Sequence, residues 1–325
     1  MKGKLIMKLC KPSFEIIEQQ SGLEGIYEMI ELAGRTCYKS SSLYRWYSED
    51  KTRWINENSE EWKFLNIPKK EYPIKGENIS AKGFVERMIK SGHGAMLEHG
   101  TIYLYLPWVS IGGIDAKYSR NKYSKSVFYS NTVCDKDGNS SFIPIEYGKA
   151  GHYITTNLRV LVENGWMDDL QYICEPTKYH EKRVCVRYTS DIHFYKDITR
   201  HRVFSWAIES TRFCNYIKQK FGSTVSFTTP MWLKGEEQEE FEEDLKTIES
   251  IYFKWINKGW QPQQAAYFLI QGTKAEIIMT GFISDYKHFF DLRSEIAKTG
   301  KPHPTVVELV EPLRQEFIKR GYING

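Results

Sequence analysis

The stretch from residue 199 to residue 213 fits neither of the two regular patterns from which folds are built. As a helix it would have no continuous apolar face, and as a strand it would place arginines and bulky apolar side chains on one side. We therefore predict a junction between regular elements. Residues 200–202 are three adjacent cations, and Ser210 and Arg212 follow them. Such a cluster suits phosphate oxygens, because a guanidinium donates two parallel hydrogen bonds to an anion. The alternative is a solvated basic turn, which has little use for the embedded Val203, Phe204, Trp206, Ala207 and Ile208.

Length and composition limit the class of protein. The 325 residues can bury a full-sized core, and 41 % apolar with 26 % charged residues is ordinary for a soluble globular protein. The net charge of +4 permits anionic small ligands but does not indicate a protein that coats nucleic acid. No apolar run approaches the roughly 20 residues that span a bilayer, and the N-terminal apolar segment is too short for a signal peptide. We expect a cytoplasmic protein without a membrane partner.

The cysteines are widely spread and form no Cys-x-x-Cys pair, so neither a metal site nor a disulfide framework is predicted. Reduced and mostly buried thiols are expected. Cys214, just beyond the basic motif, is the one possible site residue among them. The six are Cys10, Cys37, Cys134, Cys174, Cys185 and Cys214.

Hydrophobic periodicity predicts a mixture of helices and strands, and no internal repeat or low-complexity linker divides the chain. An acidic run at residues 235–244 opens a helix, where its charge complements the macrodipole. Residues 41–75 lack periodicity and are expected to be a loop region or a partner-facing insertion, and residues 135–139 a hairpin turn. Helices are predicted over residues 12–38, 80–92, 153–164 and 166–173 and before Arg200, and strands over residues 101–106, 184–189 and 274–282.

Residues 117–131 alternate basic residues with tyrosines. This pattern could stack nucleobases and contact phosphates. A solvated polar loop is the interpretation that the modest net charge favours.

Several motifs together resemble one family. Arg-His-Arg followed after seven residues by Ser is the signature of the flavin-dependent thymidylate synthases, and residues 200–210 match it. Residues 204–216 resemble the form of the motif in bacterial and phage members, so a host cytoplasm is the alternative location. Residues 93–99 resemble the family's His-x-x-x-x-Glu-His motif before a strand. Residues 33–40 and the Phe-Phe-Asp-Leu-Arg ending of residues 285–293 resemble two further family segments.

The resemblance implies an α+β fold, with a mixed or antiparallel sheet flanked by helices. It implies one domain over residues 1–325, with insertions at about 41–75 and 111–150. It also implies binding of FAD by His93, Glu98, Arg200, His201, Arg202, His288 and His303. The nucleotide would be held by Asp197, Glu209, Ser210, Thr211, Arg212 and Arg293.

Arg293 and Ser210 are the implied catalytic residues, with Arg293 polarising the uracil carbonyl as C5 becomes nucleophilic. A helix-capping or surface arginine is the plain alternative for Arg293. In the family, methylenetetrahydrofolate donates one carbon to C5 of dUMP, reduced FAD supplies hydride, and NADPH reduces the flavin. The family's sites form between subunits of a homotetramer.

The chain departs from the family pattern at a few positions. Ala266 stands where the family has a phosphate-binding arginine, and loss of one such partner costs about 1.5–3 kcal/mol of binding energy if nothing replaces it. Ala207 and Ile208 stand where many members have Asn-Glu. Two alternatives therefore stay open: hydroxymethylation of dUMP or dCMP for base modification, and an inactive nucleotide- or RNA-binding homologue.

Overall fold

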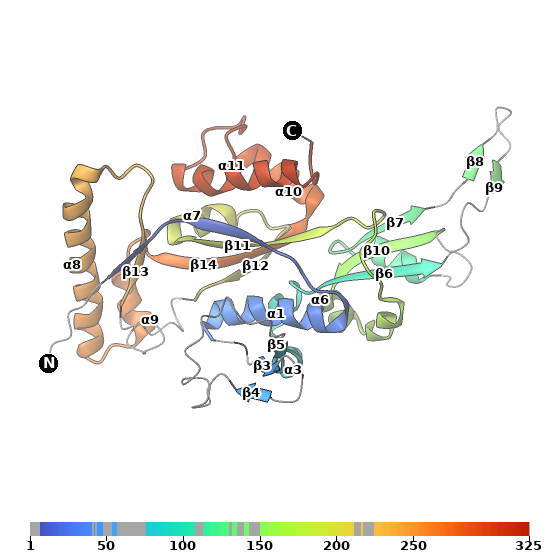
Figure 1. Cartoon of the computed structure of the whole chain (residues 1–325), viewed down its shortest axis with the longest axis horizontal. Coiled ribbons are helices and arrows are strands. Elements are labelled where there is room, and N and C mark those ends of the chain that lie inside the picture. The colour runs from blue at the N-terminus through green and yellow to red at the C-terminus, as the bar shows by residue number, and fades with distance from the viewer. Residues whose placement is uncertain are drawn as a thin grey trace.

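A four-stranded antiparallel sheet forms the centre of the molecule (Figure 1). The computed structural model describes residues 7–40, 42, 44–47, 54–56, 76–107, 113–129, 132–134, 140–142, 150–210, 216 and 224–324. The strand order is β12–β14–β11–β2, and every neighbouring pair is antiparallel. The strands are β2 (Ser13–Ile17), β11 (Arg183–Asp191), β12 (Ser205–Ile208) and β14 (Lys274–Phe282).

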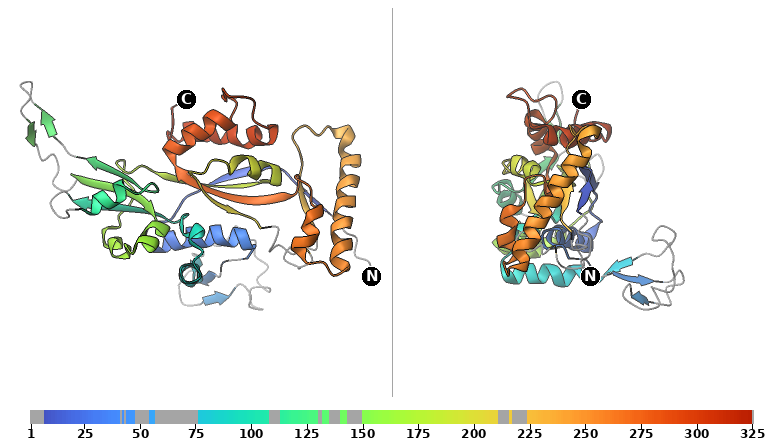
Figure 2. Two further views of the ribbon diagram at one scale, coloured as in Figure 1. Left: turned by 180° about the vertical axis from the view of Figure 1, so that it is seen from behind. Right: turned by 90° about the vertical axis from the view of Figure 1, so that its left-hand side faces the viewer.

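Helices cover both faces of this central sheet, because its strands alternate between two sets of buried side chains. On one face Val186, Tyr188 and Met279 pack in the core beneath three helices. On the other face Cys185 and Ile278 pack against α1 (Gly22–Tyr38). Figures 1 and 2 show the three helices above the sheet and α1 below it. The three are α7 (Ile192–Ile198), α10 (Ile283–Arg293) and α11 (Pro304–Lys319).

A second antiparallel sheet, in the order β6–β10–β7, carries its own core. Its strands are β6 (Thr101–Pro107), β7 (Lys125–Tyr129) and β10 (Gly151–Asn157). The nearby helices are α3 (Ala81–Ser91), α4 (Gly94–Leu97), α5 (Ile114–Ser119), α6 (Leu158–Asn164) and the 3₁₀ helix η1 (Met167–Tyr172).

The remaining elements form smaller groups. β1 (Lys8–Cys10) pairs in parallel with β13 (Ser226–Thr228), whereas the other described strand pairs are antiparallel. Because helices pack against mainly antiparallel sheets, the fold is α+β, as predicted. Next to it lie η3 (Gly235–Glu237), α8 (Gln238–Asn257), α9 (Pro262–Ala265) and η4 (Ala266–Phe268). Two short antiparallel groups are β3 (Tyr44–Tyr47) with β4 (Trp54–Asn56) and β5 (Gly76–Asn78), and β8 (Thr132–Cys134) with β9 (Ser140–Phe142).

Most predicted elements are confirmed: α3, β6, β11, α7, β14 and the helix α8 that the acidic run opens. The single domain over residues 1–325 stays a prediction. The predicted turn at 135–139 and most of the predicted insertion at 41–75 lie outside the described residues.

The predicted helix over residues 12–38 is wrong in its first part, which is the strand β2. The adjacent Ile16 and Ile17 face opposite sides of the central sheet, and both sides are covered. Two consecutive apolar residues therefore imitate one edge of a helical stripe. The helix itself begins at Gly22.

Two further predictions are corrected by strand pairing. The predicted helix over residues 153–164 begins at Leu158, because residues 151–157 form the middle strand β10, and the side chain of Asn157 caps α6 by accepting the Val160 N–H at 3.2 Å. The predicted loop over residues 117–131 contains the end of α5 and the strand β7. Tyr118 is buried there and donates to Asp169 at 2.6 Å, so it belongs to the core.

The state of the cysteines and the character of the helices can be stated for the described residues. Cys10, Cys37, Cys174 and Cys185 are free thiols, of which Cys185 is buried and the others are half-buried. Among the helices that the structure describes, none has the length and apolar character to cross a membrane.

Candidate active site

The basic motif forms a tight turn between α7 and β12, which confirms the predicted junction. Asp191 caps α7 by accepting the Phe194 N–H at 2.8 Å. After the helix, the His201 N–H donates to the Ile198 carbonyl at 3.1 Å, and the chain enters β12 at Ser205. Phe204 anchors the turn, since it is only 4 % exposed and packs on the sheet.

Gly281 of β14 makes this anchoring possible. A Cβ at this position would lie 2.2 Å from Cδ1 of Phe204, well inside van der Waals contact. The turn can therefore approach the sheet only because residue 281 has no side chain.

Arg293, His201 and Asp197 form a contiguous polar group at this turn. Nε of Arg293, at the end of α10, donates to Nε2 of His201 at 3.0 Å. Its Nη1 donates to Asp197 at 3.4 Å, and both side chains of this ion pair are about 18 % exposed. The structure thus brings together three predicted site residues from α7, the turn and α10.

The imidazole of His201 is neutral at ordinary pH. Burial, with the charges of Arg293 and His288, lowers the pKa of His201 to about 4, although Asp197 acts in the opposite direction. Because Nε2 accepts the Arg293 hydrogen bond, the proton of the neutral ring lies on Nδ1. Arg293 is therefore oriented by a neutral acceptor and a carboxylate.

The outer surface of the turn is cationic. Arg200 and Arg202 are exposed, and neither makes an ion pair with any residue that the structure describes. His288 is also exposed, with its ring centroid 6.2 Å from that of His201. Arg200 and Arg202 flank His201 in the chain, and His288 lies next to its ring, so these three predicted flavin-binding residues border the Arg293–His201–Asp197 group.

His303 lies at the N-cap of α11, where its Nδ1 accepts the Thr305 N–H at 3.3 Å. Its ring lies 3.9 Å from that of His193 and 5.7 Å from that of Trp232, measured between centroids. Sequence reasoning named His303 but missed His193 and Trp232. Nothing in their local sequence distinguishes them, because only tertiary packing brings the three rings together.

A second, ionic group lies at the far end of β12. Glu209 is buried, and its carboxylate accepts hydrogen bonds from Lys274 at 3.1 Å and from the Glu276 N–H at 3.0 Å. Lys39 forms ion pairs with Glu209 at 3.1 Å and Glu276 at 2.7 Å. Burial opposes ionisation of Glu276, yet Lys274 and Lys39 lower its pKa to about 2. Glu209 is therefore part of a buried ion-pair cluster with two lysines.

Sequence reasoning missed Lys39, Lys274 and Glu276 as members of this group. Lys39 follows α1 with a positive φ of 47°, a conformation that a lysine rarely adopts. The family-like segment at residues 33–40 was the available signal for it. Next to the cluster, the Ser210 N–H donates to the Cys37 carbonyl at 3.1 Å, which holds the start of the predicted nucleotide end. Thr211 and Arg212 lie outside the described residues.

His93 and Glu98 lie on the α1 side of the sheet, away from His201 and Arg293. Nδ1 of the exposed His93 is 3.3 Å from the hydroxyl of Tyr38, at the end of α1. The carboxylate of Glu98 accepts from Arg159 at 2.5 Å. The predicted flavin residues thus fall into two groups on opposite faces of one chain.

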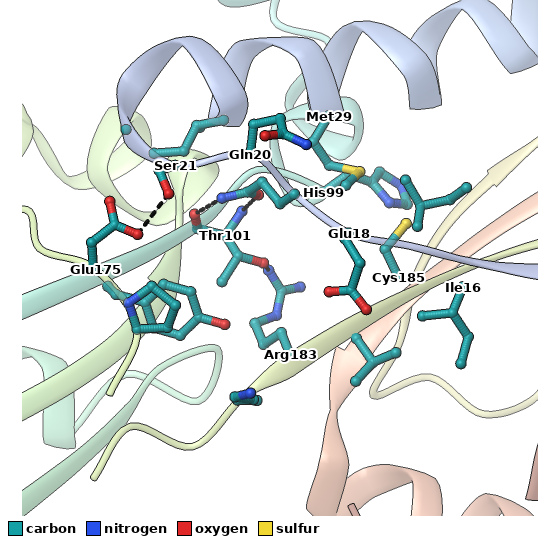
Figure 3. Close-up of a pocket in the computed structure, with 18 of the residues that line it drawn as sticks. Ile16, Glu18, Gln20, Ser21, Met29, His99, Thr101, Glu175, Arg183 and Cys185 are labelled. Atoms are coloured by element: carbon teal, nitrogen blue, oxygen red, sulfur yellow. Dashed lines mark hydrogen bonds between the residues drawn. The ribbon is translucent and has the colours of Figure 1, made fainter. Parts of the chain in front are cut away.

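A cavity of about 130 Å³ lies between the residues that follow Glu98 and the central sheet, and His99, Thr101 and Arg183 line it (Figure 3). Arg183 of β11 donates to the Glu98 carbonyl at 2.9 Å and to the hydroxyls of Thr101 at 3.2 Å and Ser205 at 3.3 Å. The fully buried His99 meets the Thr280 hydroxyl at 2.9 Å, and burial with Arg183 lowers its pKa to about 3. These contacts fix where residues 93–99 lie relative to β12 and β14.

Residues 183–304 match the family described as "Thymidylate synthase complementing protein". A curated protein of Pyrococcus furiosus, described as a flavin-dependent thymidylate synthase, is 30 % identical over 98 residues. This alignment covers 30 % of the chain and 39 % of that relative, so the chain spans well under half of its length. The predicted resemblance is confirmed over the matched segment, which contains residues 200–210 and Arg293 but neither His93 nor Glu98.

Two solved structures of the UMP/dUMP methylase PolB from Streptomyces cacaoi also align with the chain. The structure with 5-Br UMP gives a TM-score of 0.40 at 11 % identity, covering 96 % of this chain and 92 % of that one. The structure with 5-Br dUMP gives a TM-score of 0.36 at 11 % identity, covering 96 % and 93 %.

Proposed function

Because residues 183–304 match the thymidylate synthase complementing protein family, we propose that this chain is a flavin-dependent thymidylate synthase. It methylates dUMP to dTMP, with methylenetetrahydrofolate as carbon donor, FAD as cofactor and NADPH as reductant. The family match carries the proposal, and the Arg293 guanidinium, held at 3.0 Å by neutral His201 and at 3.4 Å by Asp197, supports it.

The residues around the turn suit a flavin dinucleotide. Arg200 and Arg202 are exposed cations without an ion-pair partner in the described part of the chain, and a pyrophosphate would supply the missing negative charge. His201 and His288 would border the ring system. When bound, the flavin supplies the hydride.

Arg293 suits a role in orienting the pyrimidine. Two of its donors are directed to His201 and Asp197, which fix the plane of the guanidinium, and Nη2, which has no partner among the described residues, would donate to a uracil carbonyl. A fixed positive charge there stabilises the negative charge that develops on the carbonyl oxygen as C5 becomes nucleophilic. Ser210 would contribute at the nucleotide end, together with Thr211 and Arg212.

The arginine that binds the nucleotide phosphate in the family is absent from its position in this chain, where Ala266 stands instead. The two lysines nearest to the nucleotide end, Lys39 and Lys274, already pair with the carboxylates of Glu209 and Glu276. This departure is the reason to test hydroxymethylation of dUMP or dCMP as the second candidate reaction.

The mass of the nucleotide product tests the proposal. Purified protein with FAD, NADPH and methylenetetrahydrofolate should convert dUMP to dTMP. Hydroxymethylated dUMP or dCMP without dTMP would establish the second reaction instead. A protein that purifies without yellow flavin, binds nucleotide and turns over none of these substrates would be the inactive homologue.

A further inference from the structure

Three rings from distant segments meet beside the Arg293–His201–Asp197 group. His193 belongs to the first turn of α7, His303 caps α11, and Trp232 lies in the loop after β13. The two imidazole centroids are 3.9 Å apart, and the indole meets His303 edge-on at 5.7 Å and 79°. His193 and Asp197 are four residues apart on α7 and therefore lie on the same face of that helix, so the ring cluster borders the proposed site.

The side chain of Trp232 is exposed. Trp232 is 53 % exposed, and in the described part of the chain His303 is its one ring neighbour. The two ring planes lie at 79° to each other, so the imidazole does not stack flat on the indole. An exposed indole beside a polar site offers a large, rigid and apolar surface on which a planar heteroaromatic ring can stack.

The imidazole of His303 offers a hydrogen-bond donor, its Nε2, beside the indole of Trp232. Its Nδ1 accepts the Thr305 N–H at 3.3 Å and lies 2.8 Å from the Thr305 hydroxyl. Burial and the neighbouring His193 lower the pKa of His303, so the ring is neutral and its proton lies on Nε2. Within the described residues, this Nε2 has no hydrogen-bond partner. It can donate to a carbonyl or ring nitrogen of a stacked ligand.

We propose that Trp232, a residue that the family resemblance does not assign, stacks its indole on the planar heteroaromatic ring of a flavin or a pterin, which the already predicted His303 contacts by a hydrogen bond from its imidazole. The proposal rests on the proposed function, which requires both FAD and a folate. The two ring systems share the flat, acceptor-rich pyrimidine edge that this arrangement recognises. His193 holds the His303 ring in place.

Binding constants for FAD and for methylenetetrahydrofolate, measured separately on the full chain, test the proposal. Loss of one aromatic stacking contact weakens binding roughly tenfold, so Trp232→Ala should raise at least one dissociation constant by that factor. Trp232→Phe keeps a stacking ring and should stay within about threefold of wild type. A change for FAD alone assigns the ring to the flavin, and a change for the folate alone assigns it to the pterin.

Trp260→Phe is the matched control. Trp260 is 37 % exposed but packs against Trp255 and Phe268 rather than against the ring cluster, and both dissociation constants should stay unchanged. If Trp232→Ala does not fold, the wild-type and Trp232→Phe proteins still decide, because FAD or folate should quench a fluorescence component that Trp232→Phe lacks.

The outcomes separate this proposal from the proposed function. Wild-type binding of both ligands by folded Trp232→Ala, or identical quenching of the wild-type and Trp232→Phe proteins, overturns the ring-binding role even in an active enzyme. Ligand binding that depends on Trp232, without formation of dTMP, supports the ring-binding role and contradicts the proposed reaction. A wild-type protein that binds neither ligand overturns both.

Discussion

At the scale of single residues, the site depends on which groups carry charge. Arg293 is a cation oriented by a neutral imidazole and a carboxylate, so its charge is not cancelled by a close bidentate partner. Glu209 was expected to bind substrate, and the structure instead places it among two lysines and a second glutamate. Its assignment as a substrate ligand stays a prediction. Its ion pairs with Lys39 and Lys274 fix the backbone next to Ser210, so a role in positioning Ser210 requires no further contact.

Replacing Arg293 by alanine should separate turnover from flavin binding. The substitution removes a charge that acts on the developing oxyanion, an effect of about 10²–10³ in kcat. Arg293→Lys retains the charge but not the fork and should recover only part of the rate. Bound flavin, measured by absorbance, should remain in both variants. Turnover at the wild-type rate in Arg293→Ala would contradict the orienting role.

The depressed pKa of His201 predicts a loss of stability in acid. The unfolded chain binds a proton below about pH 6.5, whereas the folded histidine binds it only near pH 4. As the pH falls from 6.5 to 4, the unfolded state therefore gains relative to the folded one, by up to about 3 kcal/mol for this group.

Denaturant unfolding at several pH values measures this effect. His201→Gln keeps an acceptor for Arg293 but cannot titrate, so its free energy of unfolding should fall less steeply between pH 6.5 and 4. His99, whose pKa is also lowered, contributes a loss of the same sign in both proteins. Identical pH profiles for the two proteins would show that His201 titrates normally in the folded state.

At the scale of elements, the junction between α7 and β12 is held against β14 by one close contact. Phe204 lies over Gly281, and this position fixes the path of the turn that carries His201. The indole of Trp206 adds a second link by donating to the His201 carbonyl at 3.3 Å. The turn therefore keeps its shape through tertiary packing rather than through its own sequence.

Gly281→Ala should destabilise the protein and weaken flavin binding together. The added methyl overlaps Phe204, and overpacking of this kind costs about 1–3 kcal/mol. Thermal unfolding and FAD titration measure the two effects. Phe204→Leu combined with Gly281→Ala should recover part of both, because the smaller side chain frees space. A Gly281→Ala protein as stable as wild type would show that the turn can move without cost.

At the scale of the whole molecule, one chain does not assemble the predicted flavin site. Arg200, His201 and His288 belong to the turn and helix on one face of the central sheet, whereas His93 and Glu98 lie with α1 on the other. Sites shared between chains would unite the two groups, in agreement with the homotetramer that the family resemblance implies. The assembly stays a prediction, which complementation can test.

Two inactive variants should restore activity when they are combined. Arg293→Ala lacks a residue of one group and His93→Ala lacks a residue of the other. Co-expressed with different tags, they should form mixed oligomers in which about a quarter of the sites have both groups intact. Light scattering after chromatography should show the oligomer. Absence of activity in purified mixed oligomers would place the complete site within one chain.

The sequence alone was sufficient for features that depend on local pattern and residue chemistry. The motif at residues 200–210 predicted both a junction and the family resemblance that the match over residues 183–304 confirms, and alternation predicted β6, β11 and β14 correctly. The sequence pattern did not predict β2 and β10, because strands that are covered on both faces lack a clean alternation. It did not predict β7, because the tyrosines and lysines there resemble a solvated loop.

Only the tertiary structure decided which of the predicted residues meet. Periodicity shows which side of an element is buried, but it carries no information on which distant side chains come into contact. The contact between Arg293 and His201 spans 92 positions of the sequence. The ion pairs among Lys39, Glu209 and Glu276 join three distant segments of the chain. The neutral state of His201 likewise depends on burial and on neighbouring charges, which exist only once the chain has folded.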